Sequence, residues 1–263
     1  MTFLSEERQN IIVDLINEQG KVLATELAAF FAVTPETIRR DLHRLEQKRK
    51  LKRVHGGAIG IFSSIESEPH FEHKRNIMLY AKTAIGKKAA GMIDDGDTIV
   101  IDVGTTTLQL AKEIQGVRNV TIVTNSIAAA NVLNDRLEKK HFEGKVIVLG
   151  GILNPDQKSL SGSITCRMLE DFCFDKAFIS CGGIMQPDIS DYDMEESLAS
   201  SIMIKQAEKA YLLVDSSKAG RRSFCRICDI SQIDCVISDC GMPSGWKKDT
   251  KVQQLEWIVA EGV

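Results

Sequence analysis

The sequence has no long hydrophobic run, and this absence bears on where the protein works. No stretch approaches the roughly 20 apolar residues that a membrane-spanning helix requires. The segment from Met1 to Glu6 also lacks the basic and then apolar pattern of a secretory signal. We therefore expect a cytoplasmic protein with no membrane partner.

Cysteines are few, and their number and spacing disfavour two kinds of cross-link. There are seven, an odd count that fits reduced thiols better than a disulfide framework. Cys225 and Cys228 form one CxxC pair, but the chain has no second CxxC and no paired histidines, and Cys235 and Cys240 have irregular spacing. Because structural zinc needs four ligands, we favour structural thiols over a metal or redox role, and we expect no cofactor.

An excess of positive charge is also missing from the chain as a whole, whose net charge is −3. The balance is nevertheless uneven: residues 1–60 hold 10 Lys and Arg against 8 acids, a net of +2, so 23 basic and 28 acidic residues remain in 61–263, a net of −5. Such asymmetry indicates that one part of a chain meets polyanions. A chain of 263 residues can form two domains, each with its own core. A basic DNA-binding domain can therefore be joined to an acidic second domain, and the low pI of the whole chain does not exclude DNA binding.

Residues 34–58 combine a capped amphipathic helix with a run of positive charge. Thr34 is a candidate N-cap, and Pro35 suits the first helical position, where its missing N–H costs nothing. Three apolar residues recur at helical spacing and predict a buried stripe: Ile38, Leu42 and Leu45. Six polar residues share the opposite, solvent-facing side, which a DNA major groove could accept: Glu36, Thr37, Arg40, His43, Arg44 and Gln47.

A short helix precedes this one, and a basic ribbon follows it. Residues 25–31 predict a helix capped by Thr25, and residues 32–34 a tight turn. Residues 51–59 predict two strands around a glycine turn. From residue 37 to 60 there are eight Lys and Arg against two acids, a net of +6, and phosphate neutralisation dominates affinity for nucleic acid. We interpret residues 1–60 as a winged helix-turn-helix domain.

At this point the residues carry a family resemblance. The strings TIRRDL at 37–42, LE at 45–46 and HGGA at 55–58 resemble the N-terminal domain of the DeoR-type (GlpR-like) bacterial transcriptional regulators. The resemblance implies a sequence-specific DNA binder, usually a repressor, whose second domain senses a phosphorylated sugar. From the helix face, the ribbon and this resemblance together we predict twelve DNA-binding residues: Thr34, Glu36, Thr37, Arg39, Arg40, His43, Arg44, Lys52, Arg53, His55, Gly56 and Gly57.

The rest of the chain predicts a linker and then a layered α/β domain. Residues 61–69 mix Ser, Glu and Pro without periodicity, so we place a linker at 61–74 and a second domain at 75–263, with a long connecting helix over 70–93. Six short apolar runs typical of a buried parallel sheet occur at 98–102, 120–124, 145–149, 177–180, 210–214 and 235–238. Helical patterns follow at 107–114, 127–137, 164–172 and 195–210. The last residues predict a helix around 252–257 and a final strand.

Four predicted strands end in small, hydroxylic or glycine-rich residues. Any one of these strand ends can be an ordinary turn, but the carboxyl ends of parallel strands meet at one sheet edge. Close backbone approach, hydroxyl donors and a helix N-terminus there favour a phosphate. The residues that we assign to this effector pocket are Asp102, Gly104, Thr105, Thr106, Thr107, Thr124, Asn125, Ser126, Gly150, Gly151, Gly182 and Gly183. Lys218 follows another strand and would add positive charge at the same edge.

These segments resemble the DeoR-type sensor domain along residues 75–240, which is in turn similar to ribose-5-phosphate isomerase and CoA-transferase-like enzymes. The resemblance implies phosphate and sugar contacts at 104–107, 124–126 and Lys218, and it places Glu195 or Glu196 near an acidic position common in the family. Residues 189–193 contain no glycine where many members have Gly-x-Thr, which leaves the sugar undefined.

Two functions follow from these patterns. The first is a repressor that binds double-stranded operator DNA as a dimer or tetramer and responds to a phosphorylated sugar effector. The second is a sugar-phosphate isomerase or transferase-like enzyme with an accessory DNA-binding module, in which Lys218 and an acid such as Asp215 or Glu195 transfer a proton. We favour the first, because no second carboxylate has the spacing that an isomerase site needs.

Overall fold

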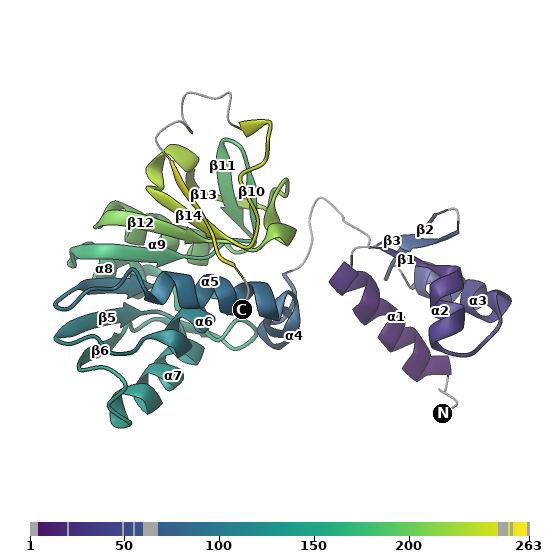
Figure 1. The fold of residues 1–263 in the computed structure, drawn as a ribbon, viewed down its shortest axis with the longest axis horizontal. Coiled ribbons are helices and arrows are strands. Elements are labelled where there is room, and N and C mark those ends of the chain that lie inside the picture. Colours follow the sequence, from purple (N-terminus) through teal and green to yellow (C-terminus); the bar gives the residue numbers. More distant parts are fainter. Residues whose placement is uncertain are drawn as a thin grey trace. The chain divides into compact units, whose positions relative to one another are not determined.

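The computed structural model describes residues 5–19, 21–48, 50–54, 56–59, 68–246, 252 and 255–261. The chain divides into two compact units, Met1–Ile65 and Glu66–Val263, which are described separately below (Figure 1). None of the helices among the described residues has the length and apolar character needed to cross a membrane.

The first unit contains three helices and a small antiparallel sheet. Its elements are α1 (Ser5–Gln19), β1 (Lys21–Leu23), α2 (Ala24–Phe30), α3 (Pro35–Gln47), β2 (Lys52–Val54) and β3 (Gly57–Ile59). The strands are ordered β1-β3-β2. The predicted helix, turn, helix and two-stranded wing are confirmed, but α2 begins at Ala24 and its N-cap residue makes no side-chain bond, so the predicted cap at Thr25 is wrong.

A parallel sheet of seven strands forms the centre of the second unit. Its order is β15-β14-β12-β9-β4-β5-β6, and every pairing between neighbours is parallel. The strands are β4 (Thr98–Ile101), β5 (Val120–Thr124), β6 (Gly144–Val148), β9 (Phe174–Ile179), β12 (Ala207–Leu213), β14 (Cys235–Ser238) and β15 (Glu256–Val259). The predicted parallel α/β fold is therefore confirmed, including the short final strand.

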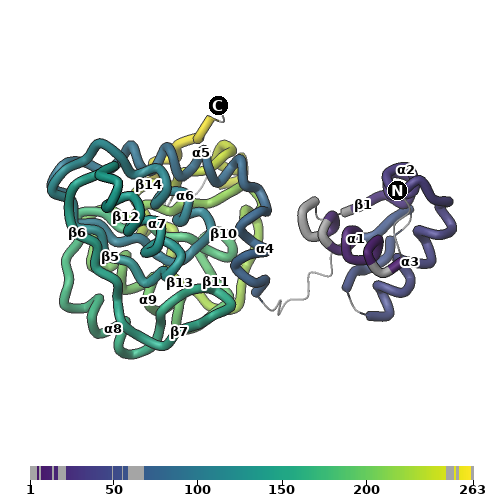
Figure 2. The backbone as a smooth tube through the Cα atoms, turned by 90° about the horizontal axis from the view of Figure 1, so that it is seen from below, coloured from purple at the N-terminus to yellow at the C-terminus, as the bar shows by residue number. Residues whose placement is uncertain are grey.

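Helices cover both faces of this sheet, which is why the inner residues of its central strands are apolar. One face packs on α5 (Leu79–Ala90), α6 (Thr105–Glu113) and α7 (Ile127–Glu138), and the other on α8 (Ser163–Glu170) and α9 (Met194–Lys205). In Figure 2, α5 and α8 lie on opposite sides of the strands. Along β4, Ile99 and Ile101 belong to the first core and Val100 to the second, as the alternation of side chains along a strand requires.

Three predicted helices need correction. The long helix over 70–93 is two helices, α4 (Phe71–Asn76) and α5, because Met78 between them adopts a left-handed conformation with φ 54°. The helix predicted over 195–210 ends at Lys205, since the residues from Ala207 pair with β9. In the predicted helix around 252–257, Glu256 and Trp257 belong instead to strand β15.

Two further sheets have no counterpart in the sequence predictions. β7 (Ile152–Asn154) and β8 (Ser159–Ser161) form a hairpin, and β10 (Gly183–Met185), β11 (Asp188–Asp191) and β13 (Cys225–Asp229) form an antiparallel sheet. Both matter for function, because β11 and the β7–β8 turn contribute residues to the cavity described below.

Candidate functional site

Helix α3 presents the predicted DNA-binding side chains on an exposed surface. The Thr34 hydroxyl accepts the N–H of Thr37 at 3.3 Å, which confirms the predicted N-cap. The apolar stripe is buried in the core of the first unit. The predicted contact residues Thr34, Glu36, Arg39, Arg40, His43 and Arg44 are exposed, and Thr37 is half-buried.

The acids of this segment are engaged with basic partners. Asp41 is buried, and its carboxylate accepts a hydrogen bond from Arg8 Nε at 2.6 Å and others from Ser5 and Gln9 at 3.2 Å. Glu46 accepts the backbone N–H of Arg53 at 3.0 Å and so connects α3 to the wing. Asp41 therefore acts within the core and does not offset the charge of the exposed face.

The wing contributes exposed basic residues around a glycine turn. Lys52 and Arg53 on β2 are exposed. Gly56 has φ +84°, a conformation that favours glycine, whereas Gly57 is buried, and a Cβ added there would lie 2.0 Å from the Val22 carbonyl oxygen of β1. Gly57 thus allows the wing to pack against the first strand, and His55 lies outside the described residues.

A cavity that is partly open to solvent lies in the second unit where several strands of the sheet end, and its empty space together with the open mouth is about 440 Å³. Its wall includes the junction of β4 and α6, with Gly104, Thr105 and Thr106, and the segment after β9, with Gly182. A Cβ on Gly104 would approach the Ser180 side chain to 2.6 Å, so only glycine allows these two segments to lie so close. The N-terminus of α6 therefore forms part of the wall, a position that favours an anion.

Of the predicted effector-binding residues, five line this cavity: Gly104, Thr105, Thr106, Gly182 and Lys218. The other predicted residues, which are not among the lining residues, are Asp102, Thr107, Thr124, Asn125, Ser126, Gly150, Gly151, Gly183 and Glu195. Their role as ligand contacts stays a prediction.

Several of these other residues have defined roles in the fold. The hydroxyl groups of Thr107 and Thr124 donate to the carbonyl oxygens of Gly104 and Ile101 at 3.1 and 2.7 Å, and Ser126 caps α7. Asp102 is 1% exposed and accepts hydrogen bonds from Ser200 Oγ at 2.7 Å and the Val103 N–H at 2.8 Å.

The other predicted residues outside the lining have contacts elsewhere in the second unit. The Gly150 carbonyl accepts the Thr165 hydroxyl at 2.7 Å, and a Cβ on Gly151 would meet that hydroxyl at 2.1 Å. Gly183 begins β10, and Glu195 accepts the Ser161 hydroxyl at 3.3 Å. The buried Asn125 amide has no hydrogen-bond partner within the part of the chain that the structure describes.

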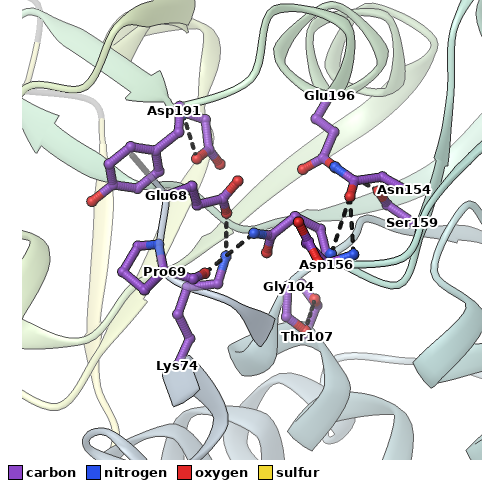
Figure 3. A network of polar contacts seen from close by, with 12 residues as sticks. Glu68, Pro69, Lys74, Gly104, Thr107, Asn154, Asp156, Ser159, Asp191 and Glu196 are labelled. Carbon is purple, nitrogen blue, oxygen red and sulfur yellow. Dashed lines mark hydrogen bonds and ion pairs between the residues drawn. The ribbon is translucent and has the colours of Figure 1, made fainter. Parts of the chain in front are cut away.

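Three lysines line the cavity. Lys82 is buried, donates to the Lys74 carbonyl oxygen at 2.7 Å and lies 3.9 Å from an Asp215 carboxylate oxygen. Burial lowers the pKa of Lys82 to about 8, although Asp215 opposes this effect. The Lys74 ammonium pairs with Glu68 (Figure 3), and Lys218 forms no side-chain hydrogen bond or ion pair with any described residue.

Three carboxyl groups line the same cavity: Glu68, Asp191 and Glu196. Burial raises the pKa of Glu68 and of Asp191, and it raises the pKa of Glu196 to about 7. The Glu196 carboxyl group also accepts hydrogen bonds from the Ser159 hydroxyl and, at 3.4 Å, from the Asn154 amide (Figure 3). Of the two acids that the family resemblance suggested, Glu196 lines the cavity and Glu195 does not.

Sequence reasoning missed a group of cavity residues that lie outside the ends of the main strands. They are Glu68, Phe71, Lys74, Gln157, Asp191 and Tyr192. Glu68 belongs to the stretch without periodicity that was predicted to be a linker, and Phe71 and Lys74 lie where that linker overlaps the helix predicted over 70–93; neither pattern marked a ligand site. Asp191 and Tyr192 lie in the segment noted for its missing glycine, which was the one available indication.

The cysteines are free thiols. Cys225 and Cys228 both lie on β13. Burial raises the pKa of Cys228 to about 12, which opposes the thiolate form that zinc binds. Among the described residues no group of three His, Cys, Asp or Glu side chains could hold a metal ion.

Comparison with known proteins identifies relatives of both units. Residues 8–63 match the DeoR-like helix-turn-helix domain, and residues 78–240 match the DeoR C-terminal sensor domain. An uncharacterized HTH-type transcriptional regulator of Staphylococcus epidermidis is 42% identical over 81% of this chain and 83% of its own. The lactose phosphotransferase system repressor of Streptococcus mutans is 34% identical over 95% of this chain and 96% of its own. Among solved structures, ribose 5-phosphate isomerase A from Neisseria gonorrhoeae aligns with a TM-score of 0.38 and 15% identity over 52% of each chain.

Proposed function

Because this chain belongs to the DeoR family of helix-turn-helix transcriptional regulators, we propose that it represses genes of sugar metabolism and that a phosphorylated sugar in its cavity controls the repression. The family is one of DNA-binding regulators, so the enzyme alternative is set aside. A similar protein named as a lactose phosphotransferase system repressor supports the link to sugars. The observation that carries the proposal is a cavity with a helix N-terminus and three lysines in the same chain as a basic winged helix.

The chemistry of the cavity suits the two halves of a sugar phosphate. Lys82, Lys218 and the first amides of α6 favour the phosphate, because ammonium groups and a helix N-terminus both stabilise anions. Asp191 and Glu196, which also line the cavity, can accept hydrogen bonds from sugar hydroxyls. A ligand that joins a phosphate to several hydroxyl groups would use both kinds of partner at once.

Operator binding calls for more than one copy of the chain. One recognition helix and one wing bury too little surface for high specificity, and paired half-sites are the usual remedy. We therefore propose that the protein binds palindromic DNA as a dimer or tetramer. Analytical ultracentrifugation with and without a selected duplex would measure the stoichiometry, and one chain per duplex would contradict this part of the proposal.

The DNA-binding assignment is tested at Arg40. Its side chain is exposed on α3, so Arg40→Ala is expected to weaken binding to a duplex selected from random DNA by the wild-type protein. The loss of one base or phosphate contact corresponds to about 1–3 kcal/mol. Arg118→Ala, which removes an exposed arginine from the second unit, is the matched control. Equal affinities for the Arg40 and Arg118 variants would remove Arg40 from the interface.

The effector assignment is tested by a thermal-shift screen with sugars and their phosphorylated forms. A ligand that binds only the folded state raises the melting temperature, so we expect shifts from phosphorylated members and none from their unphosphorylated counterparts. The shift should shrink in Lys218→Ala, because that substitution removes a positive charge from the lining of the cavity. Equal shifts from both forms of a sugar would contradict a phosphate site.

A further inference from the structure

One wall of the cavity is a short segment that leads into the second unit. The segment Glu68–Lys74 contributes Glu68, Phe71 and Lys74 to the lining. It is fastened to the turn between β7 and β8, because the Phe71 N–H donates to the Asp156 carbonyl oxygen at 2.8 Å and the Gln157 amide donates to the Pro69 carbonyl oxygen at 3.2 Å. Figure 3 shows this segment beside the cavity residues.

This segment also brings an ion pair into the cavity. The side chains of Glu68 and Lys74 are 12% and 17% exposed, and their charged groups are in direct contact. Figure 3 shows Glu68 bonded to Lys74, with the Asp191 carboxyl group beside it. Asp191 raises the pKa of Glu68, in addition to the larger effect of burial. Lys74 thus binds the carboxylate of Glu68, although the nearby Asp191 disfavours the charged form of Glu68.

The role of this pair rests on the proposed function, because it concerns the anion that the cavity would receive. A phosphate that enters the cavity carries more negative charge than a carboxylate and more oxygen acceptors for the same ammonium. It would also be repelled by Glu68. The stronger attraction of phosphate to Lys74 and its repulsion by Glu68 both favour a state in which Lys74 binds the ligand and no longer pairs with Glu68.

We propose that Glu68 is an internal competitor of the effector anion for Lys74, and that its displacement transmits occupancy of the cavity to the chain that leads to the DNA-binding unit. Glu68 is joined to Ile59 of the wing through residues 60–67. An effector can shift an equilibrium only by its differential affinity for two states, and the exchange of partners at Lys74 supplies that difference.

Whether the substitution Glu68→Gln raises or lowers the affinity for phosphate tests the competition between Glu68 and the ligand for Lys74. Glu68→Gln keeps the shape of the side chain and removes its charge, so inorganic phosphate measured by ³¹P NMR titration is expected to bind on the order of tenfold more tightly than to the wild type. The control is Glu72→Gln on the same segment, because Glu72 pairs outside the cavity with Lys158 and Arg75. If Glu68 instead helps to hold the ligand, Glu68→Gln will weaken phosphate binding, and the proposal is overturned.

A double-mutant cycle ties the effect to Lys74 and guards against a folding defect. In the Lys74→Gln background the Glu68→Gln change should add far less than tenfold, since the contested ammonium is absent and only the repulsion by Glu68 remains. A tenfold gain in that background would show that Glu68 acts on the ligand through general charge repulsion and not through Lys74. That result would overturn the proposed competition.

Hydrogen exchange of the Phe71 amide tests the transmission. This N–H is bonded to Asp156, so displacement of Glu68 is expected to speed its exchange both in the wild type with saturating phosphate and in ligand-free Glu68→Gln. The ligand-free variant should also bind DNA with the affinity of the phosphate-saturated wild type. Slower exchange on phosphate binding would overturn the transmission.

The outcomes separate this inference from the proposed function. If the wild type binds neither inorganic phosphate nor any phosphorylated sugar, the phosphate site itself is refuted and the competition falls with it. If the wild type binds phosphate and Glu68→Gln binds it no better than Glu72→Gln does, only the role of Glu68 is refuted.

Discussion

For the replacement of Asp41 by alanine, the net charge and the structure predict opposite changes in DNA affinity. By charge alone, loss of this acid raises the net charge of residues 37–60 from +6 to +7 and should strengthen DNA binding, with a salt dependence steeper by about 0.9 in log–log slope. The structure predicts the opposite. The carboxylate is 3% exposed and bonds to Arg8, Ser5 and Gln9, so its loss destabilises the unit that carries the recognition helix.

The magnitude follows from the burial of the pair. Removal of one partner from a buried ion pair costs about 3–5 kcal/mol, and the Arg8 side chain of this pair is only 10% exposed. The core of a unit this small rarely supplies more than about 3–5 kcal/mol. Asp41→Ala is therefore expected to unfold the first unit in a large share of molecules and to lower apparent DNA affinity accordingly.

Hydrogen exchange of the intact protein measures this effect within the unit. We expect amides of α3 to lose protection by roughly 100-fold or more, which corresponds to about 3 kcal/mol, while amides of the second unit keep theirs. Glu36→Gln is the control, since Glu36 and Arg39 form an exposed pair whose contribution is small. Tighter DNA binding with a steeper salt dependence and unchanged α3 protection would refute the reasoning.

Three more predictions concern the cavity and the wing. Gly104→Ala places a Cβ 2.6 Å from the Ser180 side chain, so calorimetry should show phosphate binding reduced by tenfold or more. Burial raises the pKa of Glu196 to about 7 from its usual 4.5, so its contribution to stability is fully present below pH 4.5 and lost as the pH rises to 7. Melting curves across this range should show the wild type losing on the order of 2 kcal/mol more than Glu196→Gln. Gly57→Ala should abolish DNA binding in a mobility-shift assay, because its Cβ would lie 2.0 Å from a backbone oxygen of β1, whereas Gly56→Ala meets no atom within 4 Å and should cost only the strain of its φ of +84°, about 1–2 kcal/mol.

Local patterns were enough to predict most of the scaffold. The cap at Thr34, the wing and the parallel strands depend on signals within a few residues, such as turn glycines and β-branched runs, and the structure confirms each of them. The helix predicted over 70–93 failed because its periodicity continues through Met78, whose left-handed backbone breaks it. Nothing in the residue types marks that position.

The cavity was predictable only in part, for a physical reason. Gly104, Thr105, Thr106 and Lys218 follow strands, and the topology of a parallel sheet brings strand ends together. Glu68 and Lys74 reach the cavity through hydrogen bonds of their segment with the β7–β8 turn. Such contacts between segments distant in the sequence leave no periodic pattern. For this reason nothing in the sequence indicated that Glu68 and Lys74 belong to the wall of the cavity.

The position of the Glu68–Lys74 segment has a practical consequence for work on isolated fragments. The match to the family's sensor domain begins at residue 78, yet a wall of the cavity comes from residues before that boundary. A recombinant fragment that begins at residue 78 would lack three lining side chains, and its cavity would be open along that side. Ligand affinities measured with such a fragment would not apply to the complete cavity, so expression clones should start upstream of Glu68.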